Sequence, residues 1–227
     1  PFITKYNNFT DDSKDYLQGI FDTILNKDIA RRLNIADTVS LENVTKFLLH
    51  SIGNKISPTK IANTLKSAGK SVDQKTVDKY IKGLVDSMLI YEAGRYNIKG
   101  KQFLSTQSKY YVVDVGMRNA LVKSSESDIG HILENIVYLE LKRRYKNVYV
   151  GEIDSGEVDF VSVNDNKYEY YQVSATTLDE NTLKRELAPF GKIKDNYPKY
   201  LLTLDDVFSN ADYNGVQKIN VLEWLLK

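Results

Sequence analysis

The apolar residues of this chain change their spacing near residue 89, from a helical period to short strand-like runs. Before this point three segments carry apolar stripes at helical spacing, and after it come short β-type runs with glycines between them. Three short helices followed by a β-hairpin is the order of a winged helix-turn-helix. We therefore expect a winged-helix module over residues 38–123.

Signals at the helix ends support this interpretation. Ser57 and Pro58 form a helix start, with serine as the N-cap and proline in the first turn, and Asp73 caps the third helix. Gly53 and Gly69 end the two helices before it. The inner face of the third helix is predicted to hold Val77, Ile81, Leu84, Val85 and Met88. The strands of the hairpin are expected at 89–92, 95–98 and 109–113, with turns at Gly94 and Gly100.

A polar stretch at 124–128 marks the expected boundary with a second domain over residues 124–227. Beyond it the patterns predict one helix, three strands, a helix and a strand, followed by a short strand and a closing helix. The expected ranges are 129–145, 148–153, 157–163, 168–174, 180–190, 199–204, 218–221 and 222–226. This order predicts an α/β (α+β) fold with a central sheet.

Composition limits the chemistry that the chain can perform. Cysteine is absent and only two histidines occur, so a thiolate site or a three-histidine zinc site is excluded. A catalytic metal would need mainly oxygen ligands, which favours Mg²⁺ or Mn²⁺. The apolar runs are too short to span a membrane, and the start of the chain lacks the pattern of a signal peptide. We expect a cytoplasmic segment of a longer protein.

Positive charge is concentrated in the predicted winged-helix module, where residues 38–112 hold 12 Lys/Arg against 5 Asp/Glu. Such an excess suits a polyanionic partner. The candidate nucleic-acid-binding residues lie on the third helix and in the wing: Gln74, Lys75, Lys79, Lys82, Arg95 and Lys99. The alternative is that the module packs against neighbouring domains and that its lysines are simply solvated.

Acidic and amide side chains form a pattern in the second domain. Glu134 lies on the predicted helix, Asp159 shares a strand face with Glu157, and Gln172 shares one with Ser174 on the next strand. The alternation also predicts that Val158 and Phe160 lie together on the opposite face. Glu134 and Asp159 are candidate metal ligands, because carboxylates can hold Mg²⁺ for phosphodiester hydrolysis. Each of these side chains could instead serve a structural hydrogen-bond network.

This order of residues resembles the PD-(D/E)xK nuclease superfamily, in which a helix Glu, a strand Asp and an (E/Q)xK strand form the active site. More closely, the chain from about residue 22 resembles the uncharacterised C-terminal domain that follows an AAA-type ATPase module in many bacterial and archaeal proteins. The matching stretches are Lys27–Arg32, Asp114–Ala120, Gly130–Val137, Glu157–Phe160, Tyr171–Ser174, Arg185–Leu187 and Tyr197–Lys199.

The resemblance implies that residues 1–37 are a helical remnant of the ATPase lid or linker, and that residues 124–227 form a restriction-endonuclease-like domain with a mixed sheet. The superfamily's catalytic lysine would fall at Ser174, which cannot supply a positive charge. Lys184, on the following helix, could reach the site instead. The implied catalytic residues are therefore Glu134, Asp159, Gln172 and Lys184. No phosphate-binding loop occurs in this chain, so we expect no ATP site here.

Three functions follow as hypotheses. The first is a C-terminal module of an AAA-type ATPase that engages nucleic acid or regulates the ATPase, with a nuclease-like core impaired by the serine. The second is an active Mg²⁺-dependent nuclease. The third is a protein-interaction or oligomerisation domain that binds a partner or a second copy of the chain.

Overall fold

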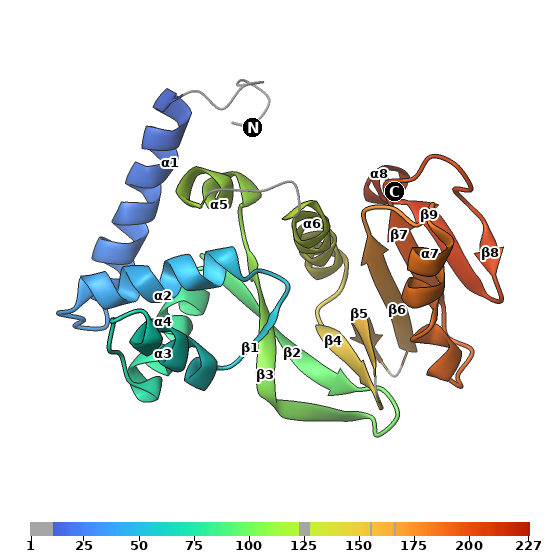
Figure 1. The fold of residues 1–227 in the computed structure, drawn as a ribbon, viewed down its shortest axis with the longest axis horizontal. Helices are drawn as coiled ribbons and strands as arrows, with labels where there is room; N and C mark the ends of the chain where they lie inside the picture. Colours follow the sequence, from blue (N-terminus) through green and yellow to red (C-terminus); the bar gives the residue numbers. More distant parts are fainter. Residues whose placement is uncertain (1–10, 123–127, 155, 166) are drawn as a thin grey trace. The chain divides into compact units, whose positions relative to one another are not determined.

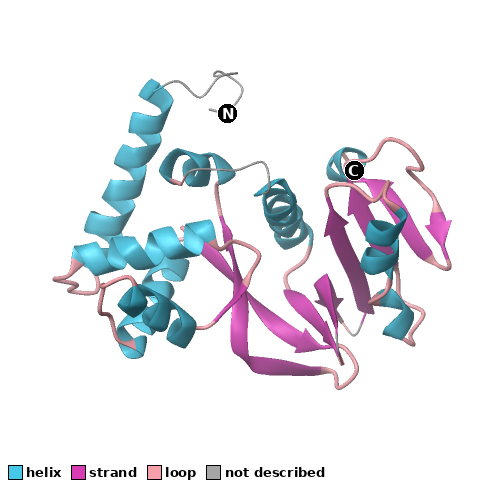
Figure 2. Cartoon of the chain, in the orientation of Figure 1, coloured by secondary structure: helices cyan, strands magenta, loops and turns pink. Residues whose placement is uncertain are grey.

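The chain divides into two units in a computed structural model that describes residues 11–122, 128–154, 156–165 and 167–227 (Figures 1 and 2). Unit 1 comprises residues 1–92 and 110–125, and unit 2 comprises residues 93–109 and 126–227. Both helices and a large mixed sheet are present, as the α/β prediction required. The hairpin at 93–109 belongs to unit 2, whereas the sequence grouped it with the module over 38–123.

Unit 1 is mainly helical. Its elements are α1 (Asp11–Thr23), the π-helix η2 (Ile24–Ala30), α2 (Thr38–His50), β1 (Lys55–Ile56), α3 (Pro58–Ser67), α4 (Gln74–Asp86) and α5 (Val115–Leu121), together with the start of β2 (Ile90–Asn97) and the end of β3 (Gln102–Val112). The three predicted helices are confirmed, with Ser57 and Asp73 as N-caps that accept hydrogen bonds from Lys60 and Thr76. Helical structure within the predicted 1–37 stretch is observed from Asp11; residues 1–10 lie outside the described residues.

Two details of unit 1 differ from the sequence prediction. Met88 is exposed rather than on the inner face of α4, because it adopts a positive φ of 52° just after the helix ends. The backbone N–H of Leu89 then bonds to the carbonyl of Leu84, a pattern that closes a helix C-terminus. Gly94 lies inside β2, not at a turn, because β2 is one strand from Ile90 to Asn97.

Unit 2 is built on a mixed sheet. Its remaining elements are α6 (Ile129–Arg144), β4 (Val148–Ile153), β5 (Gly156–Asn164), β6 (Lys167–Ser174), α7 (Glu180–Leu187), the 3-10 helix η4 (Phe190–Lys192), β7 (Lys199–Thr203), β8 (Asp212–Tyr213), β9 (Val216–Asn220) and α8 (Val221–Leu225). The strand order is β3-β2-β4-β5-β6-β7-β9-β8. Parallel pairs join β2 to β4, β6 to β7 and β7 to β9, and the pairs β4–β5, β5–β6 and β8–β9 are antiparallel.

Helices pack against this sheet at different strands. Helix α6 contacts β4, β5 and β6, α7 contacts β6, and α8 contacts β7 and β9 (Figure 1). An apolar core lies between the strands and the α7–η4 segment, and it includes Val158, Val161, Phe190 and Leu201. Within the described ranges, none of the helices has the length and apolar character needed to cross a membrane.

A register irregularity interrupts β5 next to the predicted carboxylates. Tyr149 pairs with Val161 but Gly151 pairs with Val158, so β5 carries one extra residue between these pairs. Such a bulge changes the direction of the side chains beside it. Phe160 accordingly packs against Tyr138 of α6, with ring centroids 5.6 Å apart, while Val158 joins the core cluster. The prediction that Val158 and Phe160 share a face is therefore wrong.

Candidate functional site: a lysine-centred carboxylate cavity

A cavity of about 650 Å³ in unit 2 brings together most of the predicted site residues. Four elements supply its polar wall: the start of α6, the strands β5 and β6, and α7. The lining residues that matter for chemistry are His131, Glu134, Glu157, Asp159, Gln172, Ser174, Arg185 and Glu186. Residues that lie up to 55 positions apart in the sequence therefore meet at one place.

Lys109 of β3 lies at the centre of the carboxylates. Its Nζ atom is 2.6 Å from Oε1 of Glu157, 2.9 Å from Oε1 of Glu134 and 3.5 Å from Oδ1 of Asp159. The Lys109 side chain is only 5% exposed. Burial disfavours its charged form, but the surrounding carboxylates outweigh this effect and raise the pKa of Lys109 above its ordinary value. The ammonium therefore stays charged.

The bonds of Asp159 connect the cluster to β6. Its Oδ2 accepts a hydrogen bond from the backbone N–H of Val173 at 2.9 Å, and its own backbone N–H donates to Oε1 of Gln172 at 3.3 Å. Burial, and then the nearby carboxylate of Glu134, raise the pKa of Asp159 to about 8, although Lys109 acts in the opposite direction.

Gln172 extends the network to α7. Its Nε2 donates to Glu186 at 2.8 Å, and the other oxygen of Glu186 accepts two bonds from the guanidinium of Arg185. His131 also lines the cavity, with Nδ1 3.9 Å from Oε2 of Glu134 and a side chain 44% exposed. The cavity is thus lined by a carboxylate cluster and by the basic side chains of His131 and Arg185, and the cluster is paired with the buried Lys109.

The loop after β6 is held against the cavity by a buried ion pair. Asp205 accepts hydrogen bonds from the hydroxyl of Thr176 at 2.6 Å and from the backbone N–H of Thr177 at 2.8 Å. Lys218 of β9 donates to the same carboxylate at 2.9 Å. Burial acts to raise the pKa of Asp205, but the bonds from Thr176 and Lys218 prevail and hold it well below its usual range. This network positions the cavity wall next to Ser174, whose hydroxyl donates to the carbonyl of Thr176 at 2.9 Å.

The structure brings Glu134, Asp159 and Gln172 together, as the sequence suggested, but Lys184 is not with them. Lys184 pairs with Glu180 at 2.6 Å on the exposed side of α7, where the two side chains are 70% and 78% exposed. Lys109 of β3, which could not be recognised from the sequence, is instead the basic residue that contacts Glu134 and Asp159. A single signal pointed to it: a lysine that opens the otherwise apolar run 110–113.

The oxygen donors at this cavity are of the type that binds a divalent metal ion, but their present positions do not form an ion site. The carboxylates and the amide of Gln172 are hard oxygen donors that suit Mg²⁺ or Mn²⁺. Across the described residues, however, no group of three or more His, Asp or Glu side chains is arranged to hold an ion. The carboxylate oxygens are directed at the ammonium of Lys109 instead.

The predicted nucleic-acid-binding residues fall in both units. Lys75, Lys79 and Lys82 are exposed on α4 in unit 1, with Lys79 donating to the carbonyl of Leu33 at 2.8 Å. Gln74 accepts a bond from the hydroxyl of Thr59 at 2.9 Å. The three lysines are therefore exposed on α4.

The two wing candidates belong to unit 2. Arg95 donates to Glu152 at 2.8 Å and to the carbonyl of Thr106 at 2.7 Å, and its side chain is only 15% exposed. Lys99 lies 3.5 Å from Asp154, and both side chains are well exposed. Arg95 therefore braces neighbouring strands, whereas Lys99 remains accessible.

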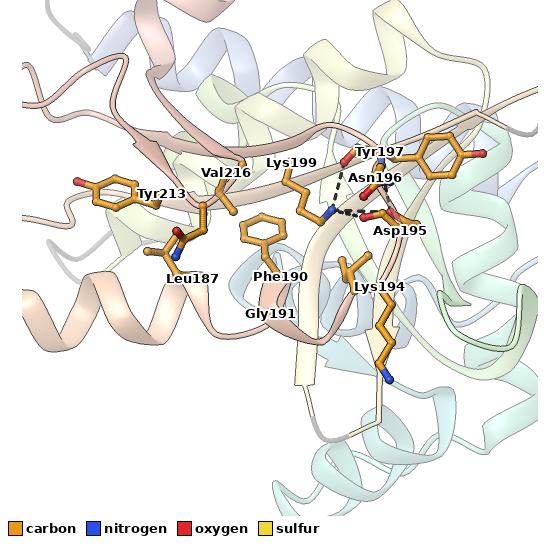
Figure 3. Close-up of a pocket in the computed structure, with 13 residues that line it drawn as sticks. Leu187, Phe190, Gly191, Lys194, Asp195, Asn196, Tyr197, Lys199, Tyr213 and Val216 are labelled. Carbon is orange, nitrogen blue, oxygen red and sulfur yellow. Dashed lines mark hydrogen bonds and ion pairs between the residues drawn. The ribbon is translucent and has the colours of Figure 1, made fainter.

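A second cavity of unit 2, about 580 Å³, lies beside the turn before β7 (Figure 3). Lys199 donates there to the backbone carbonyls of Asp195 and Tyr197, at 2.8 and 3.3 Å, and Tyr170 donates to the carboxylate of Asp195 at 2.6 Å. Phe190 is buried in its wall. These bonds secure the turn, so we assign this cavity a structural role.

The fold and the cavity define a mixed α/β chain with a buried, lysine-centred carboxylate cluster. By sequence the chain belongs to a family described as "Domain of unknown function (DUF8612)", whose model matches residues 3–128. An uncharacterised protein of Haemophilus influenzae is 39% identical over 93% of this chain and 52% of its own length. The uncharacterised protein MJ1544 of Methanocaldococcus jannaschii is 34% identical over 92% of this chain and 45% of its own length.

The chain therefore spans about half the length of these two relatives. A search of solved structures found protein VC1899 from Vibrio cholerae, which is 10% identical over 95% of this chain and 55% of that chain. Its TM-score of 0.28 is too low to support an argument about fold.

Proposed function

We propose that this chain is the nucleic-acid-engaging C-terminal module of an AAA-type ATPase, and that unit 2 is a nuclease-like core that hydrolyses phosphodiester bonds with a divalent metal ion. The observation that carries the proposal is that Glu134, Glu157 and Asp159 line one cavity and converge on the buried ammonium of Lys109. A helix Glu, a strand Asp, a neighbouring Gln and a buried lysine are the group types that this hydrolysis uses.

The reaction would be a simple displacement. The oxygen of a water molecule forms a bond to phosphorus while the bond from phosphorus to the leaving oxygen breaks. The water loses a proton to solvent, and the leaving oxygen takes one up. A bound Mg²⁺ or Mn²⁺, held by Glu134 and Asp159, would neutralise charge on the phosphate and favour ionisation of the water.

The chain's own residues have separate roles in this proposal. Lys109 offsets the mutual repulsion of the carboxylates. Gln172 accepts a hydrogen bond from the backbone N–H of Asp159 and so keeps Asp159 in place. Arg185 lies at the cavity and its side chain is 72% exposed, so it is accessible to a phosphate.

Two further observations support the wider assignment. Helices α2, α3 and α4, followed by the β2–β3 hairpin, have the element order of a winged helix, and α4 presents exposed lysines. The relatives are about twice as long as this chain, which leaves room for an ATPase domain.

The test is a cleavage assay with labelled single-stranded DNA, duplex DNA and RNA in Mg²⁺ or Mn²⁺. Asp159→Ala and Glu134→Ala serve as site variants, because a contaminating nuclease would survive both changes. Cleavage by the wild type that both variants lose supports the proposal. Equal cleavage by all three proteins, or cleavage by none, would contradict the catalytic half and leave nucleic-acid binding or regulation of the ATPase as the function.

A further inference from the structure

The carboxylate cluster contains more negative charge than a buried site tolerates without a cation. The side chains of Glu134, Asp159 and Glu157 are 10%, 12% and 21% exposed, and each lies within 3.5 Å of Lys109. Like charges this close repel strongly where water is largely excluded. The cluster is therefore held together by its positive partner.

Among the described basic residues near these three acids, Lys109 is the best placed for that task. The imidazole of His131 is 3.9 Å from one carboxylate and is 44% exposed. The guanidinium of Arg185 is bonded to Glu186 on α7. Lys109 makes ion pairs with all three acids of the cluster.

We propose that Lys109 is the positioning residue of the site: its ammonium gathers Glu134, Glu157 and Asp159 into one arrangement and supplies the fixed positive charge of the carboxylate cluster. This inference rests on the proposed function and deepens it. The charge comes from β3, the strand of the hairpin, and not from β6, where Ser174 lies, or from α7, where Lys184 lies. The hairpin is thus an integral part of the site.

Replacing Lys109 by a lysine on another strand separates the effect of its charge from the effect of its packing. Ser174 lines the same cavity as Glu157 and Asp159, and it follows Gln172 by two residues on β6, so both side chains lie on one face. A lysine introduced at position 174 would bring an ammonium to the cluster from a different strand. It cannot restore any packing that Lys109 provides.

The experiment compares five proteins: the wild type, Lys109→Met, Ser174→Lys, the double variant that carries both changes, and Lys199→Met. Lys199 is a matched control because its side chain is also largely buried, at 11% exposure, but lines the second cavity. Initial cleavage rates are measured on labelled nucleic acid in Mn²⁺, and melting temperatures are measured in EDTA.

We expect Lys109→Met to cleave about 100-fold more slowly. The cleavage rate of the double variant should be within about tenfold of the wild-type rate, because the lysine at position 174 again places a positive charge beside the carboxylates. Lys199→Met should cleave at the wild-type rate. Wild-type cleavage by a folded Lys109→Met would overturn the inference. So would a double variant that melts like the wild type but remains as slow as Lys109→Met.

The melting temperatures test the role of Lys109 even if the protein does not cleave nucleic acid. Should the wild type cut nothing, the catalytic proposal fails, but Lys109 must still be the cation of the cluster: Lys109→Met should melt lower and the double variant should recover. Equal melting of the wild type and Lys109→Met, or no recovery, overturns the inference. Should Lys109→Met not fold, the comparison is repeated with Glu157→Gln in every protein, which removes one negative charge.

Discussion

At the scale of single residues, the buried carboxyl groups of Asp159 and Asp205 in unit 2 have pKa values shifted in opposite directions. Burial and the neighbouring carboxylate of Glu134 raise the pKa of Asp159 to about 8. Asp205 is also buried, but its bonds to Thr176 and Lys218 hold its pKa well below the usual range. Ionisation of Asp159 destabilises the folded state, whereas ionisation of Asp205 stabilises it. The two groups should therefore change the stability of the protein in different pH ranges.

Asp159 should make the metal-free protein less stable as pH rises. Its pKa is near 3.8 when unfolded and about 8 when folded, so the folded state retains a proton that the unfolded state loses. The stabilisation is complete below pH 3.8 and is lost as pH approaches and passes 8. Calorimetry in EDTA from pH 5 to 8 should show a steeper fall in Tm for the wild type than for Asp159→Asn. Parallel curves for the two proteins would contradict this account.

Asp205 should have the opposite pH dependence. Its contribution is present above the unfolded pKa of 3.8 and is lost as pH falls through the lower pKa of the folded state. Asp205→Asn leaves the ammonium of Lys218 buried without its carboxylate, and we expect a loss of about 3–5 kcal/mol in the free energy of unfolding. Urea unfolding at pH 7 measures this loss. The double variant Asp205→Asn/Lys218→Met should recover most of it, because the amide oxygen of asparagine can still accept a bond from Thr176 or Thr177. A double variant as unstable as the single one would show that the buried ammonium is not the cause.

At the scale of elements, helix α4 approaches η2 so closely that a Cβ atom at one position would force neighbouring side chains to shift. A Cβ atom on Gly83 would lie 2.8 Å from Cδ1 of Leu33 and 2.9 Å from Cγ2 of Ile29. Arg32 adds hydrogen bonds from this region to the carbonyl of Gly83 and the hydroxyl of Ser87. The matching stretch Lys27–Arg32 therefore has a packing role at the start of unit 1.

Gly83→Ala should lower the free energy of unfolding by about 1–3 kcal/mol, because the added methyl group must displace Leu33 and Ile29. Gly19→Ala in α1 is the matched control, since its Cβ would meet none of the described heavy atoms within 4 Å. Alanine there should stabilise the helix by up to about 1 kcal/mol. Thermal unfolding measures both variants, and a Gly83→Ala protein as stable as the control would refute the close approach.

Most elements could be predicted from the sequence because helix caps and hydrophobic periods are local signals. Ser57 and Asp73 marked helix starts correctly. The bulge in β5 could not be predicted, because it depends on pairing with β4, and it moved Phe160 to a different face. Lys109 was missed for a related reason: its acidic partners lie 25 to 50 residues further along the chain, and only the folded sheet brings them together.

At the scale of the whole chain, exposed lysines and clustered carboxylates lie in different units. Exposed lysines lie on α4 in unit 1, whereas the carboxylate cluster lies in unit 2. Lysines bind phosphates without reading base sequence, and such binding weakens as salt increases. We therefore expect binding of nucleic acid and cleavage of nucleic acid to depend on different residues.

The paired change Lys75→Ala/Lys82→Ala should weaken duplex binding at every sequence. Two lost phosphate contacts should reduce the slope of log affinity against log salt by about 1.8. Fluorescence anisotropy at several salt concentrations measures the slope. The exposed pair Lys146→Ala/Lys167→Ala in unit 2 is the control for the same change in net charge. Equal slopes for the two pairs would contradict a role for α4.

The most direct test of the central claim measures cleavage and stability together for Asp159→Asn at pH 8. If the carboxylate cluster is a reaction site, the variant should lose cleavage in Mn²⁺ while its Tm in EDTA rises by a few degrees, about what the relief of one buried charge provides. If the cluster is only a structural ion-pair network, the variant should cleave like the wild type, and that result would contradict the account.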